Sequence, residues 1–155
     1  MRIAVGADHA GYELKEKIKF HLERLGYAVD DCGTVSSDSC DYPDFAHAVA
    51  CRVASGEDQR GILICGSGIG MAIAANKTPG VRAANISSEY EARMSREHND
   101  LNVLTMGARI LAEGQAMAIV DVWLHTQFAG GRHQQRLNKL AALESPKPLT
   151  EAEPA

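Results

Sequence analysis

The stretch that decides the fold is Gly61-Ile62-Leu63-Ile64-Cys65-Gly66-Ser67-Gly68-Ile69-Gly70. Its first half is a continuous apolar run of strand length, which is typical of a strand covered on both faces in a parallel sheet. Its second half alternates glycine with other residues and leads into a short apolar helix, expected at residues 71–75. The sequence therefore predicts a strand, a tight glycine-rich turn and a helix, the repeating unit of an α/β protein.

The same alternation continues on both sides of this stretch. Further strands are expected at residues 3–7, 27–29, 81–86 and 101–106. Helices are expected at residues 14–25, 45–54, 88–98, 112–128 and 132–143. The first helix stops at Gly26, and residues 33–44 are rich in Ser, Asp and Pro and predict a loop. The pattern predicts a doubly wound, Rossmann-like α/β fold, with a five-stranded parallel sheet and helices on both faces.

The length of the chain limits its domain organisation. Its 155 residues suffice for one compact domain with a core and are too few for two ordinary ones. We expect residues 1–145 to form a single domain, because no linker divides them and no internal repeat occurs. Residues 146–155 hold three prolines and lack apolar periodicity, so they are expected to form a disordered tail.

The composition excludes several functional classes. Lys and Arg total 16 against 20 Asp and Glu, and no basic tract interleaves with aromatic residues, so no nucleic-acid partner is expected. No apolar run approaches a membrane span and the N-terminus lacks a secretory signal, so we expect a cytoplasmic protein with no membrane partner. The four cysteines show no metal-ligand spacing and are expected to be thiols in a reducing compartment, with no metal site.

Ligands of an open α/β sheet bind beyond the carboxyl ends of its strands. The residues expected at those ends are Asp8, His9, Cys65, Asn85 and Arg109. The glycines of segment 66–70 let backbone N–H groups turn toward an anion at the start of a helix, although they equally suit a plain tight turn. The segment is a poor dinucleotide fingerprint, because the pattern needs a glycine where Met71 stands.

Several side chains near these positions suit acid–base chemistry on an anionic ligand. Cys65 next to free amides favours a thiolate that acts as base or nucleophile, whereas its alternative is a core cysteine. Asp8 also suits a helix cap, and His98 suits the dipole at a helix end. Arg132 and Arg136, four residues apart, fit a phosphate or a solvated basic face. The residues assigned to structure, surface or packing are Cys32, Cys40, Cys51, His21, His47, His125 and His133.

Taken together, these residues resemble a known family. The sequence is similar to ribose-5-phosphate isomerases of the B type, a group that includes allose- and galactose-6-phosphate isomerases. The segments that carry the resemblance are Gly6 to Gly11, Asp41-Tyr42-Pro43, Gly61 to Gly70, Ala74 to Lys77, Ser95 to Asp100, Asn102-Val103-Leu104 and Gly130 to Arg136. They span the chain from Met1 to about Leu143, and the C-terminal tail is not part of the match.

The resemblance implies an aldose–ketose isomerase of the pentose phosphate pathway that interconverts D-ribose 5-phosphate and D-ribulose 5-phosphate, with no metal and no cofactor. It makes Cys65 the base that moves a proton between C2 and C1. It makes His98 the acid–base that opens the sugar ring, with Asp8 acting on the bound sugar. The backbone amides that it assigns to the anion hole of the enediolate are those of Gly66, Ser67, Gly68, Ile69 and Gly70. Ser67 stands where many members have Thr and keeps a hydroxyl for proton transfer.

The resemblance also implies how the substrate is held. Arg132 and Arg136 match phosphate ligands, with His9 as a further contact. The remaining substrate-binding positions are Tyr42, Asn99 and Arg109. In the family the site is shared across a homodimer, so His98, Asn99 and Arg109 are expected from the partner chain. A dimer and a dimer of dimers both stay open.

Two alternatives stand beside the pentose reaction. A related isomerase of allose 6-phosphate has a substrate one carbon longer, and one pocket can accept both sugars. A non-catalytic phosphate or nucleotide sensor can use the same fold, although the set of Cys65, His98 and paired arginines argues against it. Because Cys65 is present and residues 66–70 contain no acid, the chain resembles the cysteine-base branch and not a silent subunit of galactose-6-phosphate isomerase.

Overall fold

A computed structural model describes residues 1–145 of the protein. Its strands are β1 (Arg2–Ala7), β2 (Ala28–Asp31), β3 (Arg60–Cys65), β4 (Ala83–Asn85) and β5 (Val103–Gly107). They pair in parallel in the order β2-β1-β3-β5-β4, which confirms the predicted parallel five-stranded sheet. The strand order reverses between β1 and β3, so the topological switch point of the sheet lies there. The tail predicted for residues 146–155 lies outside the described residues.

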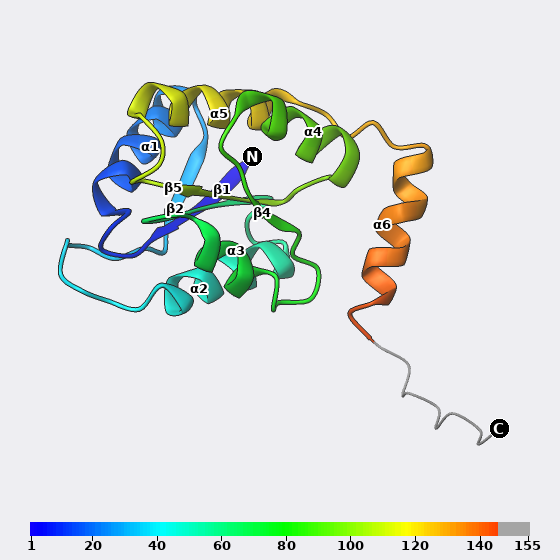
Figure 1. The fold of residues 1–155 in the computed structure, drawn as a ribbon, viewed down its shortest axis with the longest axis horizontal. Coiled ribbons are helices and arrows are strands. Elements are labelled where there is room, and N and C mark those ends of the chain that lie inside the picture. The colour runs from blue at the N-terminus through cyan, green and yellow to red at the C-terminus, as the bar shows by residue number, and fades with distance from the viewer. Residues whose placement is uncertain (146–155) are drawn as a thin grey trace, which may run out of the picture.

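Helices cover both faces of this sheet, as predicted. They are α1 (Tyr12–Arg24), α2 (Tyr42–Ser55), α3 (Ile69–Ala75), α4 (Glu89–Asn99), α5 (Glu113–His125) and α6 (Arg132–Ala142). Figure 1 shows α1, α4 and α5 on one face and α2 and α3 on the other, with α6 outside both layers. Residues of α6 and of the β4 edge line a common pocket, so α6 lies next to β4. None of the helices in residues 1–145 is long and apolar enough to cross a membrane.

The core consists of two apolar layers separated by the sheet. Successive residues of β3 show how the layers form, because side chains of a strand alternate between its faces. Ile62 and Ile64 pack under α1, α4 and α5 around the fully buried Trp123. Leu63 and Cys65 pack under α2 and α3. The continuous apolar run of β3 is therefore explained by burial on both faces.

Some element boundaries differ from the predicted ones. Helix α2 begins at Tyr42 within the predicted loop, because Asp41 has the extended backbone of an N-cap and Pro43 fits the first helical turn. Strand β4 is shorter than residues 81–86, because the amide of Arg82 donates to the side chain of Asn102 instead of a neighbouring strand. Helix α5 ends at His125, where Thr126 turns to extended backbone.

The start of α4 confirms a local sequence signal. The Ser88 side chain accepts a hydrogen bond from the Glu91 amide at 3.2 Å, and the Glu91 carboxylate accepts one from the Ser87 amide at 2.9 Å. This reciprocal arrangement satisfies amides that the first helical turn leaves without partners. The boundary at this end was therefore predictable from a few consecutive residues.

Lys15 gives a stability prediction, because its side chain is buried between two carboxylates. Its ammonium lies 2.6 Å from Asp31 Oδ2 and 2.7 Å from Glu16 Oε1. Lys15→Met is expected to lower the free energy of unfolding by about 3 kcal/mol, the lower end of the range for breaking a buried ion pair. The lower end applies because Asp31 keeps Lys19 as a second partner. Urea unfolding measures this loss, and the exposed Lys17→Met variant is the control that should change little.

The same cluster predicts a pH dependence. Burial alone would raise the pKa of Asp31, but hydrogen bonds from Lys15, Lys19 and the Gly33 amide outweigh burial and lower it. A lowered pKa in the folded state means that this stabilisation is present above the unfolded pKa and is lost as pH falls through the folded one. We expect Lys15→Met to weaken this acid sensitivity, and an unchanged acid profile would contradict the assignment.

Candidate active site

The candidate site lies at the switch point between β1 and β3, as the sheet topology predicts. A cavity of about 410 Å³ opens there, beyond the carboxyl ends of the strands. Its lining residues are Asp8, His9, Ala10, Tyr42, Cys65, Gly66, Ser67, Gly70, Arg109 and Ile110. Most of them were predicted as site residues, and they come from four separate parts of the chain.

The glycine-rich loop 66–70 takes a shape that other residues would not allow. Gly68 has a left-handed φ of +81°, and a Cβ there would lie 2.7 Å from the Met106 carbonyl carbon and would also overlap Asn85. A Cβ at Gly70 would lie 2.7 Å from the Tyr42 ring, so this glycine makes the room in which Tyr42 sits. The loop is therefore a tight turn that is also closely packed, which agrees with the structural interpretation of its glycines.

Two residues of the neighbouring strands β5 and β4 hold the loop by hydrogen bonds to its carbonyl oxygens. Thr105 on β5 is fully buried and donates its hydroxyl to the Gly68 carbonyl at 2.8 Å, and Asn85 at the end of β4 donates to the Ser67 carbonyl at 3.0 Å. Because N–H and C=O of a trans peptide point in opposite directions, the amides of Gly68 and Ile69 point away from Thr105 and Asn85, and they donate to Cys65 Sγ at 3.1 Å and to Ser67 Oγ at 3.3 Å. The preorganised donors of an anion hole need such support.

Sequence reasoning gave neither of these two residues a role. Asn85 was placed only at the end of a strand, and Thr105 was not singled out. The available signal was a single polar residue within the apolar strand Val103–Gly107. It becomes informative only when the strand order places β5 beside β3 and Thr105 under the loop.

Cys65 is both a core residue and a residue of the cavity wall. It is buried, with 5% of its surface exposed, and packs in the core layer under α2 and α3. It also lines the cavity, and its Sγ accepts the Gly68 amide at 3.1 Å. The site thus holds a thiol that is fixed beside the glycine-rich loop and reaches the cavity.

Asp8 and His9 follow β1 directly and line the same cavity. The Asp8 carboxylate accepts the amides of Ala10 at 3.0 Å and Gly11 at 3.2 Å, so it holds the turn into α1, the structural role considered for it. It is buried but still reaches the cavity. His9 accepts an amide of the loop before α2 through Nδ1. Both residues are therefore fixed by backbone hydrogen bonds.

The structure corrects the expectation that Arg109 comes from a partner chain. Arg109 lines the cavity of its own chain with Cys65, and its amide donates to the Gly66 carbonyl at 3.0 Å. A Cβ at Gly66 would lie 3.1 Å from the Arg109 guanidinium. The reason is the strand order, which pairs Gly107 directly with Cys65. The cavity therefore contains a positive charge of its own.

The other predicted residues do not line this cavity. His98 at the end of α4 stacks on His133 of α6, with ring centroids 4.4 Å apart. Arg132 and Arg136 are exposed on the first two turns of α6. The pKa of His133 is lowered by burial and by its titratable neighbours His98, Arg132 and Arg136, which favours a neutral His133 ring. One chain thus presents the predicted site residues in two separate groups.

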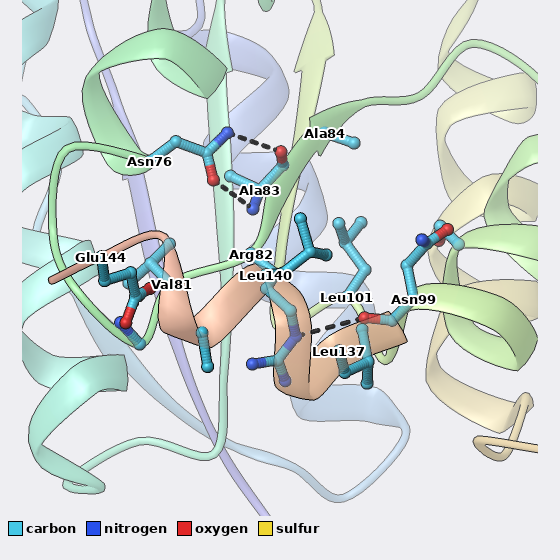
Figure 2. A pocket seen from close by; sticks show the side chains of 13 residues that line it. Asn76, Val81, Arg82, Ala83, Ala84, Asn99, Leu101, Leu137, Leu140 and Glu144 are labelled. Carbon is cyan, nitrogen blue, oxygen red and sulfur yellow. Dashed lines mark hydrogen bonds between the residues drawn. The ribbon is translucent and has the colours of Figure 1, made fainter. Parts of the chain in front are cut away.

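Asn99 lies in a different pocket, of about 530 Å³, between α6 and the β4 edge. Figure 2 shows the backbone carbonyl of Asn99 accepting a hydrogen bond from Arg82. Leu137 and Leu140 of α6 line the same pocket. In the same view the Asn76 amide pairs with the backbone of Ala83. This pocket holds no thiol and no glycine loop, so we do not place the chemistry there.

The fold and the cavity define a structural class. The protein is a doubly wound α/β protein whose switch point holds a cavity lined by a thiol, a glycine-rich loop and an arginine. The family model described as Ribose/Galactose Isomerase matches residues 3–140. The chain therefore belongs to the ribose/galactose isomerase family.

Named relatives agree with this membership. Ribose-5-phosphate isomerase B of Escherichia coli strain K12 is 51% identical over 143 residues, which cover 92% of this chain and 96% of that protein. The solved ribose-5-phosphate isomerase B of Clostridium thermocellum has a TM-score of 0.92 and 52% identity, over 93% of this chain and 97% of its own. The Mycoplasma genitalium structure with bound ribulose-5-phosphate has a TM-score of 0.90 and 40% identity, over 94% and 97%.

Proposed function

We propose that this chain interconverts D-ribose 5-phosphate and D-ribulose 5-phosphate through an enediolate. The observation that carries the proposal is that Cys65 lines the cavity and its Sγ accepts a hydrogen bond from the glycine-rich loop. The chain is also 51% identical to a ribose-5-phosphate isomerase B. Aldose–ketose isomerisation needs a base over a C–H bond and donors for the developing oxyanion, and these two parts supply them.

The proposed reaction moves one proton between neighbouring carbons. The Cys65 thiolate removes the proton from C2, and the electron pair left on carbon forms the enediolate. The loop amides stabilise its oxygen, typically by about 2.7–4 kcal/mol per donor in the transition state. The Ser67 hydroxyl passes a proton between the two oxygens, and the Cys65 thiol returns its proton to C1. The thiolate is regenerated, so no other reactant is needed.

Binding energy from the phosphate positions the reacting carbons. We propose that Arg132 and Arg136 hold the phosphate with His9, and that His98 opens the ring with Asp8. Because the arginines and His98 lie away from the cavity of their own chain, they are proposed to complete the cavity of a second copy. Tyr42 and Arg109 complete the substrate contacts from the first chain, and Asn99 from the second.

The surface around the cavity supports this shared site. Ile69 and Ile73 of α3 are 57% and 58% exposed, and Ile110 at the cavity is 65% exposed. Exposed apolar side chains that gather beside a site are typical of interaction surfaces. We therefore propose a homodimer, which can pair again into a tetramer. Four free cysteines within the described residues support a cytoplasmic, reducing compartment.

Activity of the purified chain tests the proposal directly. Ribose 5-phosphate is expected to give ribulose 5-phosphate with a higher kcat/KM than allose 6-phosphate gives its ketose. A higher value for allose 6-phosphate would favour the hexose isomerase. If neither sugar reacts while ribose 5-phosphate still binds, the proposal fails and the non-catalytic sensor is favoured.

Mixing two inactive variants tests the shared site. Cys65→Ala and His98→Gln homodimers each lack one group in every site. After random mixing in equal amounts, half the dimers are hybrids, and each hybrid holds one intact site, so about a quarter of wild-type activity is expected. The control is Cys65→Ala mixed with a Cys65→Ala/His98→Gln double variant, which restores none. Absence of recovery in the first mixture, with subunit exchange verified, would assign both residues to one chain.

A further inference from the structure

His9 is held by a hydrogen bond that determines where its proton sits. The backbone N–H of Cys40 donates to His9 Nδ1 at 3.2 Å. A ring nitrogen can accept a hydrogen bond only through a free lone pair, so Nδ1 carries no proton in this arrangement. A neutral imidazole then carries its single proton on Nε2.

We propose that the Cys40 amide fixes His9 as the neutral Nε2–H tautomer and thereby makes His9 a hydrogen-bond donor to the ligand in the cavity. The Cys40 amide is a positioning group, because it acts through His9. The usual partner that orients a functional histidine is a carbonyl or carboxylate oxygen that accepts a hydrogen bond from a ring N–H. A backbone donor has the opposite effect, since it reserves Nδ1 as an acceptor.

Both partners of this hydrogen bond are attached to rigid parts of the fold. His9 directly follows β1, and the Asp8 side chain braces the turn after it. The loop that carries Cys40 begins with the Thr34 amide donating to the Ala7 carbonyl at 3.0 Å and ends at the start of α2. The loop is therefore held at both ends, and its last residues before α2 bring the Cys40 amide to His9.

The thiol of Cys40 does not account for the arrangement. Its Sγ lies 4.0 Å from His9 Nδ1, at the limit of a sulfur hydrogen bond, and a thiol is a weak donor. The amide at 3.2 Å is the stronger donor. This difference separates the backbone from the side chain and gives the experiment a matched control.

The consequence for the ligand rests on the proposed isomerase function. A neutral Nε2–H can donate to a phosphate or sugar oxygen but has no free Nδ1 with which to take up a proton. His9 therefore contributes to binding and orientation, and proton transfer is left to other groups. The tautomer itself does not depend on which substrate the chain uses.

Nitrogen-15 NMR of the imidazole side chains measures the tautomer in the ligand-free protein at neutral pH. His9→Gln identifies the His9 signals by their loss. The expected spectrum shows a protonated Nε2 and an unprotonated Nδ1. An Nδ1–H tautomer, or a ring protonated on both nitrogens, would overturn the proposal even if the enzyme is an active isomerase.

Variants at position 40 separate the amide from the thiol. Cys40→Ala keeps the amide, so the His9 tautomer should stay the same. Cys40→Pro removes the N–H donor, and a folded variant should show a mixture of His9 tautomers. A tautomer that changes in Cys40→Ala would assign the effect to the thiol and overturn the role of the amide. A pure Nε2–H form in folded Cys40→Pro would do the same.

Two replacements of His9 test the donor role. Gln places its amide nitrogen near the position of Nε2, whereas Asn places its amide nearer to Nδ1. We expect KM for the sugar phosphate to rise about 10- to 100-fold in His9→Asn and clearly less in His9→Gln, as for loss of a hydrogen bond to a charged ligand. Effects on kcat should be smaller than on KM. Equal losses in both variants would overturn the donor role, whatever the NMR result.

Discussion

Cys65→Ala is expected to lower kcat for ribose 5-phosphate by about 10²- to 10⁴-fold, the range for loss of a positioned general base. The substrate should still bind, because Arg109 and the loop residues that line the cavity remain. KM should therefore change little. Steady-state kinetics with both sugar phosphates, together with direct binding of ribose 5-phosphate, separates the loss of chemistry from loss of binding.

Two further variants control for packing and for thiol loss in general. Cys65 is buried in the core, so Cys65→Ser keeps the side-chain size while replacing the thiol by a much weaker acid. It should be folded and nearly as inactive as Cys65→Ala. Cys51→Ala removes an exposed thiol on α2 and should remain active. High activity of Cys65→Ser or Cys65→Ala would remove Cys65 from the role of base.

Gly68→Ala is expected to have the second large effect, because it distorts the donor loop. The residue has φ of +81°, and its Cβ would overlap Asn85 and lie 2.7 Å from the Met106 carbonyl carbon. The loop must shift to relieve the contact, which moves the amides that we propose to face the substrate oxygen. Loss of one such donor lowers kcat by about 10²- to 10³-fold. Left-handed strain should also cost about 1–2 kcal/mol of stability.

Gly80→Ala is a matched control for this prediction. Gly80 has φ of +85°, but nothing lies within 4 Å of the position of its Cβ, and it lies outside the cavity lining. It should lose a similar amount of stability through backbone strain and keep its activity. Thermal unfolding and kinetics of the two variants separate strain from misplacement of the loop. Normal kcat in a folded Gly68→Ala variant would contradict the anion-hole assignment.

Local patterns predicted much of this architecture. The apolar run of β3 followed by alternating glycines gave a strand, a turn and a helix, because burial on both faces and positive φ leave direct marks on a sequence. The Ser88 cap was readable for the same reason, since a helix start is settled within four residues. The predicted helix boundaries were less accurate. Helix α2 begins at Tyr42, within the predicted loop, because Asp41 and Pro43 form a helix start there.

Cys65 shows how far such local reasoning reaches at the site. Its place at the end of a buried strand, next to glycines, followed from the sequence and from the rule for α/β sheets. The resemblance to a family then gave roles to His98, Arg132 and Arg136. Their division between two places on one chain did not follow, since it depends on where α6 stands relative to the sheet.

The sequence alone determined the alternating α/β pattern, the glycine loop and the thiol beside it, because each depends on residues close together in the chain. Only the tertiary structure decided that Arg109 shares a cavity with Cys65, that Thr105 and Asn85 hold the loop from below, and that the Cys40 amide meets His9. The contacts made by Thr105, Asn85 and the Cys40 amide join residues 37, 18 and 31 positions apart, and Arg109 is still farther from Cys65 along the chain. Strand order and packing bring them together, and neither property leaves a local mark on the sequence.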